Sequence, residues 1–565
     1  MRKRQTLLLF SGFFVMGLCT LPGLGQTDDT AMKMSWDLFR AVETGQQQRA
    51  VGDEVPEVRA VLLARSSVTS ADLADLRELG YDVLAAFGRF VLVSAPADRF
   101  ADQESGLAAL HFVLNAALPP ELLESSTSPG TSGATTIGVP EVWDLGYRGA
   151  GAVIAVIDSG FDPQSTALAS VCPTYWNITS LPMTVGGYEA VEGQVAQNSA
   201  HGTSCAIIAS DVAPDAEFHL ISSPQSMQPL GWLFALDYAV NVLEADVVTI
   251  SIETTGCYCH NDGTGPINDL VASILDGSDA AFVVASGNWA GGTGSDRWHY
   301  TGTFSDADGD GHHDFTPGAT DAWDRNTLRF YARGGDRITV FVEWDDWDAE
   351  VHYEDLDLYI LDETYGIPVG ESRAPQYGGT GNPAESIPGG WLPFTIPLTG
   401  YYCVRVTNRA VTEHDAAMDP IEFSLFAINA DGPFGYVEHS TQCGSVREVA
   451  THPLAITVGA VSFDTLELRS YSSRGPTNGG VVKPDLCAPD GVRGTAYSVF
   501  YGSSAAAPYV AGAIALLRSV DSNLSPEQAV TILQETATVT TDSCGNTVSA
   551  IDVYQAIQAV LEGNE

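Results

Sequence analysis

Residues 501 to 508, YGSSAAAP, have the composition expected of a nucleophile at the start of a helix. Gly502 lets a substrate backbone approach closely, and the alanines that follow leave room around a serine hydroxyl. Pro508 is tolerated in the first helical turn, where free N–H groups can face a negative charge developing on a substrate oxygen. The stretch therefore predicts a nucleophilic serine, with a helix cap and small-residue packing as the alternative.

Two further candidates lie upstream of this stretch. Asp158 ends the apolar run GAVIAVID, at the carboxyl end of an expected strand, where α/β sheets bind ligands. His201 begins the small-residue segment AHGTSCAIIAS, so that its ring can face a cleft. Taken alone, Asp158 is better explained as a turn cap and His201 as packing near Cys205. The chain has no regularly spaced His and Cys residues of the kind that bind zinc.

The order of these residues resembles that of the subtilisin-like serine proteases, the subtilases. The motifs Asp158-Ser159-Gly160, His201-Gly202-Thr203, Gly287-Asn288 and residues 502–508 are similar to the family's D-[ST]-G, H-G-T, A-G-N and G-T-S-x-A-x-P, with Ser503 replacing the usual threonine. VAPDAEFHLI, ADVVTISI, YSSRGPT and KPDLCAPDG extend the resemblance from about residue 138 to the end.

The resemblance implies a catalytic triad in which Ser504 attacks, His201 takes its proton and Asp158 orients the imidazole. It also implies that the Asn288 side chain and the Ser504 backbone N–H form the oxyanion hole. Cys205 matches a position where some subtilases carry a cysteine. Sensitivity to thiol reagents, an inert buried thiol and a disulfide partner all remain open for it.

Substrate binding is carried over with one departure from the family. The resemblance implies that a peptide binds as an added strand along Ser251, Ile252 and Glu253 and beside Ser286 and Gly287. Subtilases commonly have Ser-x-Gly where this chain has Ser251-Ile252-Glu253. Glu253 could favour a basic substrate residue, but we expect a solvated carboxylate at the rim of the cleft.

Alternating strand-like and helix-like segments position these residues. VIAVID, EFHLISS, ADVVTISI, AAFVVAS and LAITVGAV read as buried strands, and WLFALDYAVNVLEA, SPEQAVTILQETA and SAIDVYQAIQAVLEG read as helices. This alternation predicts an α/β fold with a doubly wound, mostly parallel sheet. We expect the catalytic domain to comprise residues 129–296 and 432–565.

Residues 297–431 break the alternation with strand-like runs and no helix between them, which predicts an inserted all-β sandwich. The insert resembles pre-peptidase C-terminal modules of secreted bacterial peptidases. Its SDADGDGHHDF places Asp306, Asp308, Asp310 and Asp314 at EF-hand positions one, three, five and nine, but position twelve is Pro317. A structural calcium loop is therefore expected rather than an EF-hand, with a solvated acidic turn as the alternative.

The N-terminal part has the character of processed segments. Residues 1–25 combine Arg2, Lys3 and Arg4 with an apolar stretch too short to span a bilayer, as in a cleaved secretory signal. Residues 26–128 contain an α+β pattern followed by a Ser/Thr/Gly-rich stretch, and they resemble the inhibitory propeptide of subtilases. We expect a zymogen matured between about residues 118 and 134.

Composition restricts the partners. The formal net charge is −45, from 26 Lys and Arg against 71 Asp and Glu, so nucleic acid and anionic membranes are excluded as partners. Outside the expected signal there are eight cysteines, an even number suited to disulfides in an oxidising compartment, although their pairing is not readable: Cys172, Cys205, Cys257, Cys259, Cys403, Cys443, Cys487 and Cys544.

These observations predict a secreted, monomeric serine endopeptidase that acts on polypeptides, is inhibited by its own propeptide and needs no catalytic cofactor. Two alternatives are a catalytically silent binding protein on the same scaffold and a peptide ligase or cyclase that uses the same triad. The natural substrate and the role of the insert are not readable from the sequence.

Overall fold

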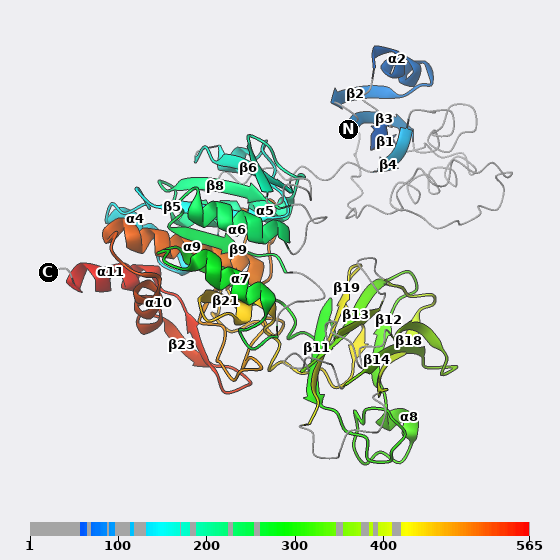
Figure 1. The fold of residues 1–565 in the computed structure, drawn as a ribbon. Coiled ribbons are helices and arrows are strands. Elements are labelled where there is room, and N and C mark those ends of the chain that lie inside the picture. Colours follow the sequence, from blue (N-terminus) through cyan, green and yellow to red (C-terminus); the bar gives the residue numbers. More distant parts are fainter. Residues whose placement is uncertain are drawn as a thin grey trace. The chain divides into compact units, whose positions relative to one another are not determined.

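The computed structural model describes residues 57–64, 69–87, 90–96, 113–117, 132–169, 171–180, 188–223, 230–253, 260–345, 354–373, 384–387, 394–409 and 420–563. The chain divides into two compact units, residues 1–124 and 125–565 (Figure 1). The expected signal segment lies outside the described residues, and of the segment expected to contain the propeptide cleavage, about residues 118 to 134, only residues 132–134 are described. None of the described helices is both long and apolar enough to cross a membrane.

The described residues of the first unit form an antiparallel sheet and a helix. The strands are β1 (Glu57–Ala64), β2 (Asp82–Phe87), β3 (Phe90–Pro96) and β4 (Val113–Ala117), in the order β2-β3-β1-β4. Thr69 caps α2 (Ser70–Glu78) in a reciprocal capping box with Asp72. The described part of this unit thus combines strands and a helix, in keeping with the α+β pattern of the sequence.

A ten-stranded sheet forms the framework of the second unit, in the order β23-β24-β22-β21-β10-β9-β5-β8-β6-β7. The pairs from β24 through β6 are parallel, and antiparallel pairs close both edges. The strands are β5 (Val153–Asp158), β6 (Thr174–Ser180), β7 (Tyr188–Glu192), β8 (Glu217–Ser222), β9 (Val247–Ile250), β10 (Ala281–Ala285), β21 (Ala455–Ser462), β22 (Leu486–Asp490), β23 (Thr538–Thr541) and β24 (Thr547–Ala550).

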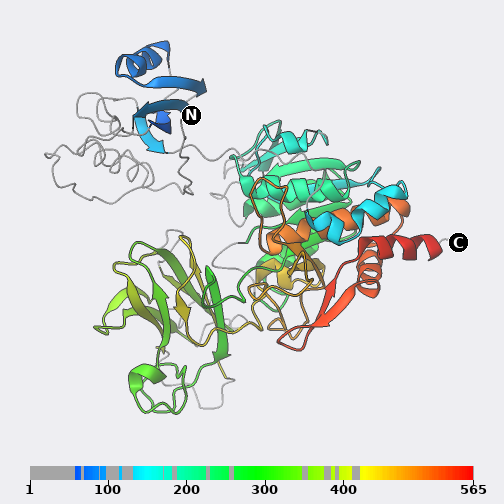
Figure 2. The same cartoon turned by 180° about the vertical axis from the view of Figure 1, so that it is seen from behind.

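Helices cover both faces of this sheet (Figures 1 and 2). The described helices of this part are α3 (Ser132–Thr136), α4 (Val139–Asp144), α5 (Ala200–Val212), α6 (Leu230–Asn241), α7 (Pro266–Leu275), α9 (Ser503–Val520), α10 (Pro526–Glu535) and α11 (Val553–Gly563). Two short 3₁₀ helices, η3 (Thr166–Leu168) and η5 (Glu448–Thr451), lie in its connections.

The central strands are buried on both faces. Since successive side chains of a strand point to opposite faces, each strand contributes to two cores. In β5, Ile154 and Val156 pack into the core that contains α5 and α9, while Ala155 and Ile157 pack into the core that contains α6 and α7. The continuous apolar run in the sequence therefore reflects two cores rather than one. The predicted doubly wound α/β class is confirmed.

The insert is a β-sandwich. One sheet has the order β11-β19-β13-β16 with β17 beside β13, and the other has the order β15-β14-β18-β12-β20. The strands are β11 (Arg297–Thr303), β12 (Leu328–Ala332), β13 (Arg337–Trp344), β14 (Leu356–Asp362), β15 (Pro368–Ser372), β16 (Ala384–Ile387), β17 (Phe394–Thr395), β18 (Gly400–Asn408), β19 (Glu422–Asn429) and β20 (Tyr436–Val437). A short helix, α8 (Ala322–Arg325), precedes β12.

The sandwich extends beyond its predicted end at residue 431. Phe330 and Tyr331 of β12 pair with Val437 and Tyr436 of β20, so the chain adds one more edge strand before it returns to the α/β part. The two-residue length of β20 explains why the sequence pattern missed it.

Candidate active site

Asp158 is the last residue of β5 and is fully buried. One carboxylate oxygen, Oδ1, accepts hydrogen bonds from the backbone N–H and the hydroxyl of Ser159, at 2.8 and 3.2 Å. The other, Oδ2, lies 2.7 Å from Nδ1 of His201. A buried carboxylate with charge-assisted and backbone partners is suited to holding an imidazole in one orientation.

His201 is the second residue of α5, whose N-cap is Ser199. The helix can approach β5 closely because residue 202 is glycine: a Cβ there would lie 2.2 Å from the carbonyl oxygen of Gly160 and 2.7 Å from Cβ of Asp158. The ring of His201 remains 30% exposed and meets Phe500 edge-on, with centroids 5.5 Å apart. His201 is thus held on one side and open on the other.

The charge environment of His201 favours its protonated form. Burial lowers the pKa of the imidazole, but the charge of Asp158 and the hydrogen bond to it outweigh burial and raise the pKa above its ordinary value of 6.5. The guanidinium of Arg297 acts in the opposite direction. Arg297 belongs to β11 of the sandwich, so a charged residue of the insert affects the pKa of His201.

Ser504 is the second residue of α9, and Gly502 is the N-cap with φ of 103°. Pro508 lies beyond the first turn, at the sixth residue of the helix, where our prediction was wrong. Because proline has no N–H, the carbonyl of Ser504 lacks its usual helical donor. Ser251 Oγ and Cys205 Sγ donate to that carbonyl instead, at 3.2 and 3.4 Å.

The hydroxyl of Ser504 donates to the carbonyl of Ser251 at 3.2 Å. Within the described residues, no hydrogen bond joins Ser504 to His201. Both residues nevertheless line one cavity of about 360 Å³, together with Asn288. The structure therefore brings the three predicted triad residues to one site, with the serine hydroxyl turned toward Ser251.

The predicted oxyanion residues also lie at this cavity. The backbone N–H of Ser503 donates to Oδ1 of Asn288 at 3.0 Å, which leaves the Nδ2 amide group of Asn288 as the available donor. Gly287, with φ of 95°, donates its N–H to Ser503 Oγ at 3.1 Å. Ser286 is buried beside them. The turn 286–288 is thus fixed against the first residues of α9.

Sequence reasoning missed Asp490, the last residue of β22. Its buried carboxylate accepts hydrogen bonds from Arg469 Nε at 2.5 Å, from the Gly502 N–H at 2.9 Å and from the Tyr471 hydroxyl. It therefore fixes the residue directly before the serines. The available signal was its place in KPDLCAPDG, an aspartate that ends a buried strand as Asp158 does.

Glu253 is an exposed residue, as expected, but its carboxylate is paired with other side chains. Its Oε2 accepts a hydrogen bond from Trp289 Nε1 at 2.9 Å and lies 3.0 Å from Nη1 of Arg297, and its side chain is 23% exposed. Ser251 and Ile252 line the same cavity. Trp289, Arg297 and Ile428, which also line it, were missed because two of them come from the insert.

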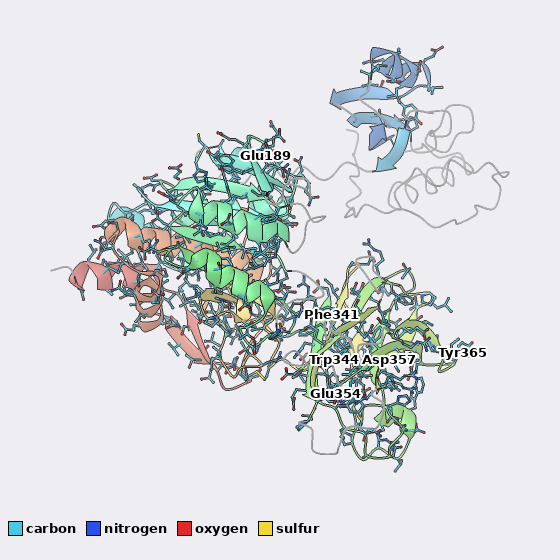
Figure 3. The ribbon with its side chains drawn as sticks, in the orientation of Figure 1. Glu189, Phe341, Trp344, Glu354, Asp357 and Tyr365 are labelled. Carbon is cyan, nitrogen blue, oxygen red and sulfur yellow. A yellow bond between two sulfur atoms is a disulfide. The ribbon has the colours of Figure 1, made fainter. Side chains whose placement is uncertain are left out.

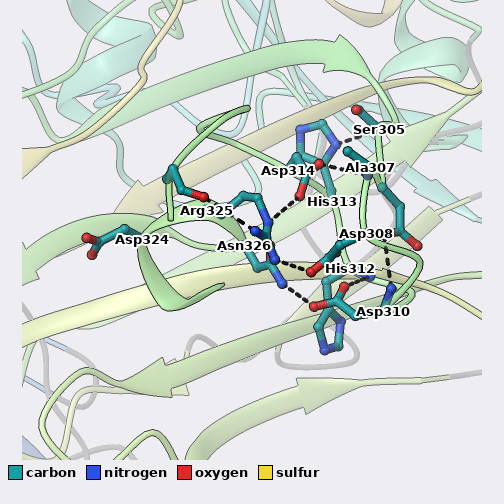
Figure 4. A network of polar contacts seen from close by, with 12 residues as sticks. Ser305, Ala307, Asp308, Asp310, His312, His313, Asp314, Asp324, Arg325 and Asn326 are labelled. Carbon is teal, nitrogen blue, oxygen red and sulfur yellow. Dashed lines mark hydrogen bonds and ion pairs between the residues drawn. The ribbon is translucent and has the colours of Figure 1, made fainter. Parts of the chain in front are cut away.

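The predicted calcium residues separate into two groups (Figure 4). Carboxylate oxygens of Asp306, Asp308 and Asp310 lie within 4.8 Å of one another. Asp314 is buried and is not part of this group, because it faces Arg325 Nε at 3.1 Å, and Arg325 also pairs with Asp308. One guanidinium thus already neutralises part of the acidic set, and the calcium site stays a prediction.

Cysteine pairing is limited among the described residues. Cys443 and Cys544 form a disulfide, while Cys172, Cys205, Cys403 and Cys487 are free. Cys205 is therefore not a disulfide partner here, and burial together with the Asp158 charge raises its thiol pKa well above the ordinary value. Cys257 and Cys259 lie outside the described residues.

Comparisons with known proteins point to one family. Residues 436–553, which include Ser504, match the model of the Subtilase family. Bacillopeptidase F of Bacillus subtilis (strain 168) is 29% identical over 133 residues, 21% of this chain, and the match spans only 9% of that protein's length.

Solved structures agree at the level of the fold. The Clostridium perfringens CspB protease superposes with a TM-score of 0.51 at 18% identity, covering 76% of this chain and 99% of that one. The match to MycP1 without its propeptide has a TM-score of 0.37 at 16% identity and covers 76% of this chain and 96% of that one. The subtilase match of residues 436–553 and the α/β sheet shared with a solved protease structure agree with the site described above.

Proposed function

We propose that this protein is a secreted serine endopeptidase, made as a zymogen, that cleaves polypeptides through an acyl-enzyme intermediate. The observation that carries the proposal is the buried Asp158 carboxylate 2.7 Å from His201 Nδ1, in a cavity that Ser504 also lines. A base oriented by a carboxylate beside a hydroxyl is the arrangement that nucleophilic catalysis needs.

The first step requires a rotation of Ser504. Its hydroxyl donates to the Ser251 carbonyl, so it must turn to donate to Nε2 of His201 before attack. Nδ1 donates to Asp158, which leaves the lone pair of a neutral ring on Nε2. As Oγ attacks the peptide carbonyl, His201 takes the proton and Asp158 stabilises the imidazolium.

The negative charge then develops on the substrate oxygen, and Asn288 Nδ2 is the side-chain donor available for it. Breakdown of the tetrahedral species releases the amine, to which His201 returns the proton, and leaves an acyl group on Ser504. Water then attacks the acyl group with the same proton transfers, which releases the acid product and restores the Ser504 hydroxyl. A ligase would differ only in the acceptor of the acyl group, so the site geometry favours neither outcome.

Casein digestion by the mature protein, with mass analysis of the products, tests this proposal. We expect new peptide termini that carry the mass of one water molecule, and no digestion by Ser504→Ala. Joined peptides would identify a ligase. Undiminished digestion by Ser504→Ala would refute the mechanism, and absence of digestion by the correctly folded wild type would favour the silent binding protein.

A further inference from the structure

Glu253 lines the cavity beside Ser504. It lies in the segment after β9, and its Oε2 accepts the indole N–H of Trp289, which lines the same cavity, at 2.9 Å. A Cβ added to Gly287 would lie 2.3 Å from Oε1 of Glu253, so the carboxylate lies against the backbone next to Asn288. A substrate group that enters this part of the cavity comes close to the Glu253 carboxylate.

Arg297 of the sandwich lies next to Glu253 in the same cavity. As the first residue of β11, it places Nη1 3.0 Å from Glu253 Oε2 and its guanidinium 4.9 Å from the centre of the Trp289 ring. Each of the two charged side chains is 23% exposed, so both face the cavity while they contact each other. The pair is therefore neutral as a unit, and each half alone would carry a full charge.

Aromatic residues of the sandwich hold Trp289 in place. Trp289 is 1% exposed and packs edge-on against Phe341 and Phe426, with ring centroids 5.7 and 5.4 Å apart. Ile428, on the same strand as Phe426, lines the cavity with Arg297. Phe341 is labelled in Figure 3, on the part of the sandwich nearest the α/β sheet. The insert thus forms part of the cleft itself.

We propose that the Arg297–Glu253 pair, assembled across the insert boundary, selects peptide substrates with an uncharged side chain on the residue whose carbonyl Ser504 attacks. This inference rests on the proposed protease function. A lysine or arginine side chain at that position competes with Arg297 for Glu253, and an aspartate or glutamate side chain competes with Glu253 for Arg297. An uncharged side chain leaves the pair intact.

Breaking the pair from either side should change the preference in opposite directions. Arg297→Met keeps the aliphatic stem and leaves Glu253 as an unpaired anion, so cleavage after lysine and arginine should increase about five- to tenfold relative to leucine. Glu253→Gln keeps an acceptor for Trp289 and leaves Arg297 as an unpaired cation, so cleavage after aspartate and glutamate should increase by a similar factor. The double variant is neutral and should return to the wild-type preference.

The experiment measures kcat/KM for peptides that differ only at this residue, with mass analysis to locate each cut, in the wild type, both single variants and the double variant. Fluorophosphonate labelling reports the fraction of each preparation with a competent site. If a single variant does not fold, the wild-type profile still decides, because strong preference for a charged residue contradicts the proposal.

Different results would contradict the specificity of the Arg297–Glu253 pair and the proposed protease function. Unchanged or parallel profiles in the single variants, with Ser504-dependent cleavage preserved, would overturn the specificity inference alone. Cleavage that persists in Ser504→Ala would overturn the proposed function. Recovery of the wild-type profile in the double variant is the result that a merely structural role of the pair would not produce.

Discussion

Arg447 offers the sharpest test of how the sandwich is joined to the α/β part. Its side chain is 1% exposed and lies between two carboxylates, 2.7 Å from Glu343 of β13 and 3.2 Å from Glu448. Its guanidinium also lies 4.6 and 4.5 Å from the ring centres of Phe341 and Phe426. Arg447→Met fills similar space and removes the charge.

The expected loss follows from the carboxylates left behind. The Glu343 and Glu448 side chains are only 6% and 9% exposed, so Arg447→Met removes a cation that pairs with two buried carboxylates. Removing one member of a buried ion pair costs about 3–5 kcal/mol. With an unfolding entropy of about 2.1 cal/mol/K per residue, this lowers Tm by about 3–5 °C if the roughly 440 residues of the second unit unfold together.

The assay is thermal and denaturant unfolding in a Ser504→Ala background, which prevents self-digestion. The control is Arg373→Met, which breaks the exposed pair with Glu371, whose side chains are 49% and 43% exposed. That pair should contribute at most about 1 kcal/mol. A stability equal to that of the control would refute the reasoning.

Further perturbations test the triad, the disulfide and the predicted calcium loop. Activity should rise with pH through a His201 pKa above 6.5, because only the neutral ring accepts a proton. Asp158→Asn should move this rise in activity to lower pH and reduce kcat about 10⁴-fold. A pH–rate profile measures both effects, and a rise at unchanged pH in Asp158→Asn would contradict the pairing of Asp158 with His201. Replacing Cys443 and Cys544 with alanine opens a loop of 101 residues and should cost about 2–5 kcal/mol in denaturant unfolding, whereas equal stability would show that the disulfide contributes nothing. If calcium binds at Asp306, excess calcium at about 100 times Kd should add about 2.7 kcal/mol in the wild type but not in Asp306→Ala, and a wild type insensitive to chelator would reject the site.

The sequence was sufficient for features that depend on local pattern. Buried strands such as β5 and amphipathic helices such as α10 follow from hydrophobic periodicity. The last helix was predicted to begin at Ser549, but Ser549 and Ala550 belong to β24 and α11 begins at Val553. The family motifs placed Asp158, His201 and Ser504 in the correct order. The distances between these side chains could not be predicted from their spacing in the sequence. Their proximity depends on parallel strands, whose carboxyl ends lie at the same edge of the sheet.

The features that the sequence did not predict depend on contacts between residues far apart in the chain. Glu253 and Arg297 are 44 positions apart, and no local pattern pairs them. Without that contact, an exposed carboxylate was the reasonable expectation for Glu253. Likewise, the rule that proline belongs in the first turn misplaced Pro508, because donors from Ser251 and Cys205 to the Ser504 carbonyl compensate for its missing N–H.

The most direct test of the central claim is covalent labelling of the mature protein by a fluorophosphonate, followed by peptide mapping. The account predicts a single modified residue, Ser504, with labelling abolished in Ser504→Ala and slowed in His201→Ala. Modification of another serine, or labelling that persists in correctly folded Ser504→Ala, would contradict it.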